Sequence, residues 1–342
     1  MKTIQLQNYA ILLIVIPVLF FSFSCEGEKD RIMTVNGWMN AEEMGITLPH
    51  EHIIVDWTGA DSFQYASWNQ DSIIMTVKPY LDEIKKLGCQ TFIDCTPSYM
   101  GRDPVVYKEL SELTGINLIY AVGYYGAIDN KYIPQHAWQE SSEEIALRWL
   151  EEWESGTHGT NIRPGIIKIG VPFDTTLSEL HQKLIRAAAK AHLQSGLTIV
   201  AHTGPGERAY EELEILREEG VSPEAFVWTH ALLGIKEDHV EIARSGAWVS
   251  FDWVSTEPED IQHIVDLIKN MKENSLLHKL LLSHDAGWYT IGEPGGGSFR
   301  PYTAIFTHLI PAMKEAGFTE ENISIIMEKN PQEAYAIKIR RL

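Results

Sequence analysis

Histidine, aspartate and lysine side chains recur along the chain at positions where they could hold metal ions. The first group is His50-Glu51-His52. In an extended strand the two imidazoles would point to one face while Glu51 points to the other. Two nitrogen ligands that converge on one point suit a zinc ion. Taken alone, the pair is as compatible with two hydrogen-bonded histidines as with metal ligands.

Three more residues of ligand type strengthen the metal interpretation. His202, His230 and Asp285 each end a run of apolar residues that is typical of a buried strand. In a closed barrel of parallel strands these ends meet at one mouth, where active sites are built. The expected convergence is the main reason to interpret His50 and His52 as metal ligands.

Lys168 lies within an otherwise apolar strand, residues 165–169. An ammonium group is costly to bury without a partner. One interpretation is a salt bridge to a carboxylate at the barrel mouth. The other is a carbamate, formed when the deprotonated amine reacts with carbon dioxide, whose two oxygens can bridge two cations. The strand sequence alone leaves both open.

Short apolar runs alternate with longer amphipathic stretches, which indicates repeated strand–helix units and predicts an α/β fold, a single-domain (β/α)₈ TIM barrel over residues 31–342. The eight expected strands are residues 46–55, 91–96, 118–123, 165–169, 198–202, 225–230, 248–252 and 280–285. The apolar spacing predicts helices that include 76–87 and 177–194. Two further helices, 320–328 and 331–339, are expected to close the bottom or side of the barrel.

Composition narrows the class of ligand. The formal charge of −19 disfavours nucleic acid and anionic lipid surfaces as partners, and favours a small-molecule substrate together with metal cations. A hydrophobic fraction of 44% is enough for a sizeable core. Cys89 and Cys95 would lie about 20 Å apart along one strand, too far for a disulfide.

The N-terminus predicts export. Residues 1–25 form a lipoprotein-type signal segment with an apolar core at residues 11–21, and residues 26–30 form a polar tether. Cys25 would become the lipidated first residue and anchor the protein to a membrane. The expected location is that of a bacterial lipoprotein facing the periplasm or the cell surface. The alternative is a plain secretory signal with an incidental cysteine.

The chain resembles the phosphotriesterase family of the amidohydrolase superfamily across essentially all of residues 31–342. The resemblance lies in the segments 45–52, 166–169, 201–204, 229–231, 250–252 and 283–285 and in the pair Asn330-Pro331. It implies two divalent metal ions, zinc being the first choice among several that these ligands accept. The first ion would be held by His50, His52 and Asp285. The second would be held by His202 and His230. Carboxylated Lys168 and a hydroxide would bridge the two ions.

The resemblance also implies a hydrolase. The bridging hydroxide would attack the substrate, and Asp285 would act as the catalytic residue that takes the proton. Tyr125 resembles a tyrosine that lactonases of the family aim at the hydroxide, although a packed aromatic is about equally compatible. Phosphotriesterases typically carry a relay histidine and an acidic partner where this chain has Trp253 and Leu233. The expected substrate is therefore a lactone or carboxylic ester. The alternatives are a phosphoric triester, or a catalytically silent binding barrel.

Residues that follow the expected strands are further candidates for substrate contact. Trp253, Trp288, Arg300 and Tyr302 are expected near the substrate, with residues 286–300 as a mobile lid. For Arg300 and Tyr302, a role in anchoring the loop is the stronger alternative. Trp57, Trp68 and Trp138 could line a pocket, but ordinary loop packing is favoured. Arg102 and Asp103 are expected to form a structural ion pair. A second copy of the chain, in a homodimer, is among the expected partners.

Overall fold

The computed structural model describes residues 30–342. The predicted signal segment, the lipidated Cys25 and nearly all of the tether lie outside the described residues, so export and anchoring stay predictions from the sequence. Between residues 30 and 342, no helix combines the length and apolar character needed to cross a membrane.

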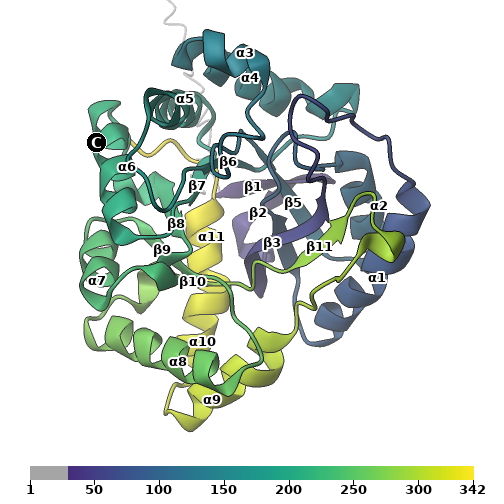
Figure 1. Cartoon of the computed structure of the whole chain (residues 1–342). Helices are drawn as coiled ribbons and strands as arrows, with labels where there is room; N and C mark the ends of the chain where they lie inside the picture. Colours follow the sequence, from purple (N-terminus) through teal and green to yellow (C-terminus); the bar gives the residue numbers. More distant parts are fainter. Residues whose placement is uncertain (1–29) are drawn as a thin grey trace, which may run out of the picture.

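A curled sheet of nine parallel strands forms the centre of the molecule, with helices around it (Figure 1). Its first eight strands are neighbours in sequence order, and β11 lies at the outer side of β3. The strands are β3 (Thr47–Val55), β4 (Thr91–Asp94), β5 (Asn117–Val122), β6 (Ile166–Gly170), β7 (Thr198–His202), β8 (Phe226–Thr229), β9 (Trp248–Phe251), β10 (Leu280–Leu282) and β11 (Gly287–Thr290).

The segment between β10 and β11 joins the two ends of this sheet. The backbone N–H of Asp285 donates to the carbonyl of His50 at 3.1 Å, and the N–H of His52 donates to the carbonyl of Ala286 at 2.9 Å. β11 then continues the contact by pairing in parallel with β3. The α/β architecture therefore matches the predicted TIM barrel, in which the carboxyl ends of all strands face one mouth.

Helices follow most strands and cover the outside of the sheet (Figure 1). They are α1 (Gln70–Lys86), α2 (Pro104–Thr114), α3 (Gln135–Gln139), α4 (Ser142–Ser155), α5 (Glu179–Ser195), α6 (Gly206–Glu218), α7 (Lys236–Arg244), α8 (Pro258–Glu273), α9 (Ile310–Glu315), α10 (Glu320–Ser324) and α11 (Asn330–Tyr335). Wider helical turns at Ile305–Leu309 and Ile325–Lys329 precede α9 and α11. A hairpin of β1 (Arg31–Thr34) and β2 (Gly37–Asn40) comes first in the described chain.

Two apolar layers stabilise the barrel. The larger layer lies between the strands and the surrounding helices. The smaller layer fills the inside of the barrel, and α11 contributes Ala334 and Tyr335 to it. The Tyr335 hydroxyl also donates to the carbonyl of Pro49 at 3.3 Å. Because this end of the barrel is filled with side chains, a ligand can reach the interior only from the carboxyl ends of the strands.

Several boundaries differ from the expectation. α1 begins at Gln70, six residues before the expected start at residue 76, because the Asn69 side chain caps the helix by accepting the N–H of Ser72. The last helix ends at Tyr335 instead of residue 339. The chain beyond it is extended, and the N–H of Ile337 donates to the carbonyl of Arg31 at 2.8 Å. The tertiary contacts of the C-terminal tail override its local helical pattern.

Candidate metal centre and active site

A cavity of about 50 Å³ opens at the carboxyl ends of the strands. Five of the six expected metal ligands line it: His50, His52, Lys168, His202 and Asp285. His230 lies immediately behind His202. The rest of the wall consists of Trp57, Cys95, Pro97, Met100, Tyr125 and Trp288. The structure thus brings together all six residues that the sequence singled out, from five strands or the residues directly after them: β3, β6, β7, β8 and β10.

Asp285 and His52 form a contact that fits a bound cation. Oδ1 of Asp285 lies 2.9 Å from Nε2 of His52. At the other side of the ring, Nδ1 of His52 lies 2.9 Å from the hydroxyl of Thr96, which itself donates to the carbonyl of Ile54. A hydroxyl carries one proton, so His52 must donate from Nδ1, and its Nε2 then presents a lone pair to the carboxylate. Two electron-pair donors facing each other are stabilised when a cation lies between them.

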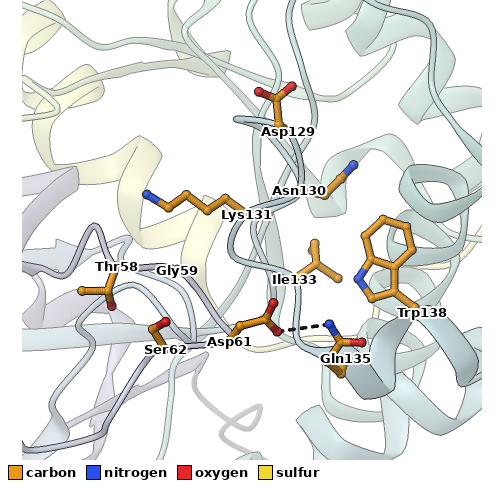
Figure 2. Close-up of a pocket in the computed structure, with 10 residues that line it drawn as sticks. All are labelled: Thr58, Gly59, Asp61, Ser62, Asp129, Asn130, Lys131, Ile133, Gln135 and Trp138. Atoms are coloured by element: carbon orange, nitrogen blue, oxygen red, sulfur yellow. Dashed lines mark hydrogen bonds between the residues drawn. The ribbon is translucent and has the colours of Figure 1, made fainter.

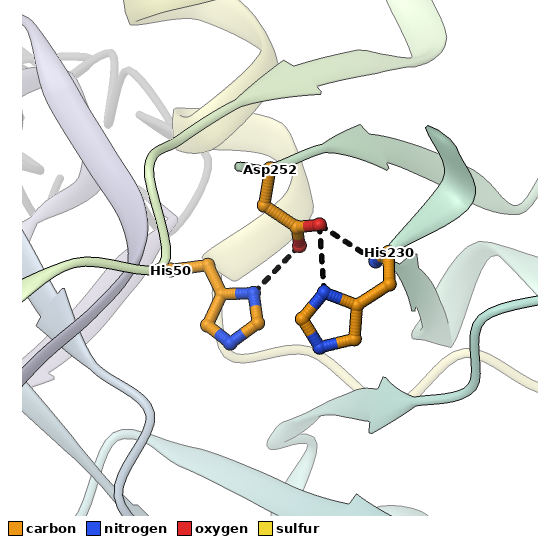
Figure 3. Close-up of side chains that lie close together, drawn as sticks. All are labelled: His50, His230 and Asp252. Carbon is orange, nitrogen blue, oxygen red and sulfur yellow. Dashed lines mark hydrogen bonds and ion pairs between the residues drawn. The ribbon is translucent and has the colours of Figure 1, made fainter. Parts of the chain in front are cut away.

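Asp252 orients two of the imidazoles (Figure 3). Its Oδ2 lies 2.6 Å from Nδ1 of His50, and its Oδ1 lies 3.0 Å from Nδ1 of His230. Oδ1 also accepts the backbone N–H of His230 at 2.8 Å. Because a carboxylate only accepts hydrogen bonds, both rings carry their proton on Nδ1 and keep a lone pair on Nε2, which faces Lys168 in His50 and His202 in His230. We therefore interpret Asp252 as a positioning residue for two ligands.

His230 and His202 face each other behind the cavity. Nε2 of His230 lies 2.7 Å from Nδ1 of His202. Burial, with the neighbouring His230 and Lys168, holds the pKa of His202 well below its usual range. Burial and Lys168 likewise lower the pKa of His50 to about 4. Neutral imidazoles are the form that binds metal ions, so this donor set fits the second expected ion as well.

Lys168 is buried on β6, and its Nζ lies 3.2 Å from Nε2 of His50. Within the described chain, no carboxylate oxygen lies within ion-pair distance of Nζ, so the salt bridge considered for this lysine is not present. The amine instead points into the cluster of imidazoles.

The carboxyl group of Asp285 is held in its ionised form. Burial alone would raise its pKa, but the contact with His52 and the nearness of His50 and His230 hold the pKa well below its usual range. Its second oxygen, Oδ2, accepts the indole N–H of Trp253 at 2.8 Å. An ionised carboxylate at this position can bind a cation and can accept a proton.

The backbone is strained where it presents these side chains. His230, Trp253, Asp285 and Trp288 all have left-handed conformations, with φ of 57°, 74°, 51° and 75°. Such a conformation costs a non-glycine residue roughly 1–2 kcal/mol. The expected strands 225–230 and 280–285 therefore end early, at Thr229 and Leu282. The left-handed turn at each end redirects the ligand into the mouth.

Glu51 compensates for this irregular backbone at the end of β10. Its buried carboxylate accepts four hydrogen bonds, from the Ser283 hydroxyl, the backbone N–H groups of His284 and Ala286, and Nδ1 of His284, at 2.6–2.9 Å. Glu51 points away from the imidazoles of its neighbours, as the alternation predicts. Its role is to fix the segment that carries Asp285.

Aromatic rings stack on three of the expected ligands. Trp288 lies on His52 with ring centroids 3.8 Å apart. Phe173 lies on His202 at 4.6 Å. Trp253 lies on His230 at 4.6 Å. These rings exclude water from the outer faces of the imidazoles and leave their nitrogens directed at the cavity.

The remaining predicted residues divide between the cavity and its supports. The Tyr125 hydroxyl lies in the cavity wall, 3.0 Å from Nε2 of His202. Arg300 is exposed and donates to the carbonyl of Asp285 at 2.9 Å, so it anchors the loop in this structure. Tyr302 is fully buried and donates to the carbonyl of His52 at 2.7 Å. The expectation that Tyr302 contacts substrate is wrong, because the residue lies behind the strand.

Two other expectations need correction. Part of the expected mobile lid is β11, which is paired with β3. Gly287, with a φ of 98°, allows this pairing because its backbone approaches the carbonyl of His52 too closely for any side chain. Arg102 pairs with Glu152 at 2.8 Å instead of with Asp103, which caps α2. Among the three tryptophans that could line a pocket, Trp57 lines the catalytic cavity. Trp68 donates to Asp103, and Trp138 lines a separate hollow.

A larger hollow of about 480 Å³ lies between the loops that follow β3 and β5 (Figure 2). Asp61 and Gln135 face each other there at 3.1 Å. Lys131 donates to the carbonyl of Trp57. This hollow is lined by none of the expected metal ligands, so the smaller cavity is the candidate active site.

Comparisons with known proteins agree with this site. The family model of the phosphotriesterase family matches residues 30–335. The phosphotriesterase homology protein of Escherichia coli is 27% identical, over 87% of this chain and 100% of its own. The aryldialkylphosphatase of Saccharolobus solfataricus is 26% identical, over 87% and 97%. The structure of a mutant PTE-like lactonase from Deinococcus radiodurans superposes with a TM-score of 0.79 and 25% identity, covering 89% of this chain and 99% of that one.

The barrel fold, the cluster of histidines and Asp285, and the similar proteins together define a metal-dependent hydrolase. The chain belongs to the phosphotriesterase family. This confirms the resemblance seen in the sequence.

Two residues of the site were not singled out from the sequence. Asp252 is the last residue of the expected strand 248–252 and directly follows β9, so the signal that indicated His202 and His230 could also have indicated it. Glu51 is a charge on the outward face of a fully buried strand. Such a residue must have partners, but the sequence does not indicate that they lie on the last strand.

A buried carboxyl group lies behind His202. Burial raises the pKa of Glu212 to about 8, although a hydrogen bond with Thr203 opposes the shift. The Thr203 hydroxyl lies 2.5 Å from Oε2 of Glu212 and 3.1 Å from the carbonyl of Ala201. Its single proton can go to only one of them. A protonated Glu212 that donates to Thr203, with Thr203 donating to Ala201, gives each of the three groups a hydrogen bond.

Glu212→Gln is therefore expected to stabilise the protein at neutral and mildly alkaline pH. Between the ordinary pKa of 4.5 and the raised value of about 8, the unfolded chain releases the proton while the folded chain keeps it, so wild-type stability falls as pH rises. We expect the variant to gain about 1–3 kcal/mol at pH 8, and no gain below pH 4.5. Denaturant unfolding across pH measures this, with Glu214→Gln on the exposed face of α6 as control. An equal effect of both variants would contradict it.

Proposed function

We propose that the protein hydrolyses a lactone or carboxylic ester with two divalent cations, zinc being the first candidate. His50, His52 and Asp285 would hold one ion, and His202 and His230 the other, with a carboxylated Lys168 between them. When bound, the two ions would acidify a water molecule to supply the nucleophile and would polarise the carbonyl group of the substrate. The relatives include phosphotriester hydrolases and a lactonase, so they leave the type of bond that is cleaved undecided. The contacts of Asp285 favour a lactone or carboxylic ester.

The hydrogen bond from Trp253 to Asp285 carries this choice. The indole N–H donates to Oδ2 and has no lone pair with which to accept a proton. A proton taken up by Asp285 therefore has no onward route through Trp253. It must leave directly to the substrate. The alkoxide released from a lactone stays tethered at the site, where it can take that proton.

Charge supports a carboxylated Lys168. An unmodified ammonium at this position would lie beside two dications and repel both. A carbamate carries one negative charge and supplies two oxygens, so it replaces this repulsion with attraction. Tyr125 lies within hydrogen-bond reach of His202 at the same wall, where its hydroxyl can orient the ring oxygen or carbonyl of the substrate.

A substrate panel on the purified protein tests the proposal. Metal would be removed with a chelator and returned as Zn²⁺ with and without bicarbonate, and turnover would be measured on γ- and δ-lactones, aryl carboxylic esters and a paraoxon-type triester. We expect kcat/KM for the best lactone to exceed that for the triester at least tenfold. We expect activity to vanish on chelation, and to return fastest with bicarbonate because Lys168 then carboxylates.

A triester turned over faster than every lactone and ester would replace this proposal with a phosphotriesterase function. A protein that takes up two metals and hydrolyses no member of the panel would favour a barrel that only binds. If activity in carbon dioxide-free buffer returns equally fast with and without bicarbonate, the carboxylation of Lys168 is contradicted.

A further inference from the structure

Phe173 contacts both histidines that are expected to hold the second ion. Its ring lies nearly parallel to the imidazole of His202, with centroids 4.6 Å apart and the two planes at 11°. The same ring meets His230 at 5.7 Å and Trp253 at 6.4 Å, in each case close to edge-on. Among the described residues, it has no ring contact with the two histidines of the first ion. Phe173 is therefore associated with one of the two expected ion sites.

Hydrogen bonds orient the other three ligand histidines. Asp252 accepts from Nδ1 of both His50 and His230. Thr96 accepts from Nδ1 of His52. Outer partners of this kind fix which nitrogen of the ring carries the proton and how the ring is turned.

His202 has no partner of this kind. Within the described chain, its ring nitrogens contact only His230 and the hydroxyl of Tyr125, which lies 3.0 Å from Nε2 and 3.5 Å from Nδ1. The Tyr125 hydroxyl makes no other hydrogen bond within residues 30–342, so it can either donate to the imidazole or accept from it. It therefore does not decide which nitrogen of His202 carries the proton. The flat face of Phe173 is the contact that limits how the ring can tilt.

The loop between β6 and α5 places Phe173 on this histidine. The N–H of Val171 donates to the carbonyl of His202 at 2.9 Å and ties the start of the loop to β7. In the part of the chain that the structure describes, residues 172–176 make no hydrogen bond. Gly204, with a φ of 73°, leaves room for the ring, because a Cβ there would lie 2.5 Å from Cδ1 of Phe173. Packing, including that of the Phe173 ring, therefore holds this segment.

We propose that Phe173 is a positioning residue for the second metal ion. It holds the ring of His202 in the tilt at which the facing nitrogens of His202 and His230, now 2.7 Å apart, can share one ion. The proposal rests on the two-ion centre of the proposed function, but it does not depend on which bond is cleaved. Loss of the Phe173 ring should let His202 tilt, and it should leave the first ion site unchanged.

Zinc titration of the metal-free, full-length protein against a competing chelating dye tests this role. The wild type should bind two ions per chain. Phe173→Ala should weaken one of the two binding steps about three- to tenfold and should speed the release of that ion to the dye. Phe173→Tyr keeps the ring and should bind both ions nearly as the wild type does. Phe173→Leu keeps most of the apolar volume without a flat face and should resemble Phe173→Ala.

Cadmium-113 NMR of the cadmium-loaded protein assigns the affected ion, because each bound ion gives its own signal. The signal that changes in Phe173→Ala should be the signal that His202→Ala removes. Phe306→Ala is the control, since Phe306 is also half-buried and, among the described residues, has no ring contact with a ligand histidine. This control should bind both ions with wild-type affinity.

Unchanged binding of both ions in Phe173→Ala would overturn the proposal. Equal weakening of both ions would overturn it too, because it would indicate a general loosening of the barrel mouth. A Phe173→Leu variant that binds as tightly as the wild type would show that the flat face does not hold His202. A wild-type protein that binds fewer than two ions would contradict the two-ion centre itself, and this inference with it.

Discussion

Asp285→Asn should lower kcat for the best lactone about 10²- to 10⁴-fold, with a much smaller change in KM. The amide keeps the shape of the carboxyl group but cannot take a proton. It also replaces one of the two oxygens by an N–H₂ group, either facing His52, which now lies 2.9 Å from Oδ1, or facing the indole N–H of Trp253. Steady-state kinetics with metal analysis on the same sample measures both consequences.

The metal analysis decides how the loss arises. Two metals per chain with a large loss of kcat would assign Asp285 to proton transfer. A loss of one metal that excess Zn²⁺ restores together with the rate would assign it to metal binding alone. An Asp285→Asn variant that retains full activity would contradict the proposed function. Asp103→Asn, at another buried aspartate where asparagine also caps a helix well, is the matched control for folding.

Asp252→Asn should weaken metal binding about 10- to 100-fold. Asp252 holds Nδ1 of both His50 and His230, and these two histidines belong to different expected ions. An asparagine can accept from one ring, but its N–H₂ group would face the other. That ring must then move its proton to Nε2, which removes the lone pair needed for a ligand.

Zinc titration of the metal-free variant measures this effect, and activity at saturating zinc should recover much of its wild-type value. Recovery separates a positioning residue from one that reacts with substrate. An unchanged zinc affinity would show that the two rings are oriented by other contacts. The Asp103→Asn variant should bind zinc as the wild type does.

The regular part of the fold could be predicted because it depends on local pattern. The expected strand 198–202 coincides with β7, and apolar runs located the other seven expected strands to within a few residues, whereas β1, β2 and β11 were not predicted. The ligands could be predicted because strand ends converge in a barrel. Their exact backbone conformations could not, since the left-handed turn at Asp285 depends on Glu51, more than two hundred residues earlier in the chain.

The contacts of Tyr302 and Arg102 could not be predicted from the sequence either. Their side chains have several chemically reasonable partners, and the choice between them follows from which chain segments lie side by side. Tyr302 contacts the backbone of β3, and Arg102 contacts α4, because of how the barrel curves. Neither partner is near in sequence, so spacing along the chain does not indicate them.

The join between the first and last strands of the barrel sets the order in which the enzyme matures. Glu51 can bind the segment that carries Asp285 only after that segment has left the ribosome, since the residues that Glu51 binds lie 232–235 positions downstream. A nascent chain therefore cannot assemble the complete set of ligands before Asp285 has left the ribosome. Metal capture is a late event in biogenesis, and a chain truncated before residue 285 would keep its histidines without a finished centre.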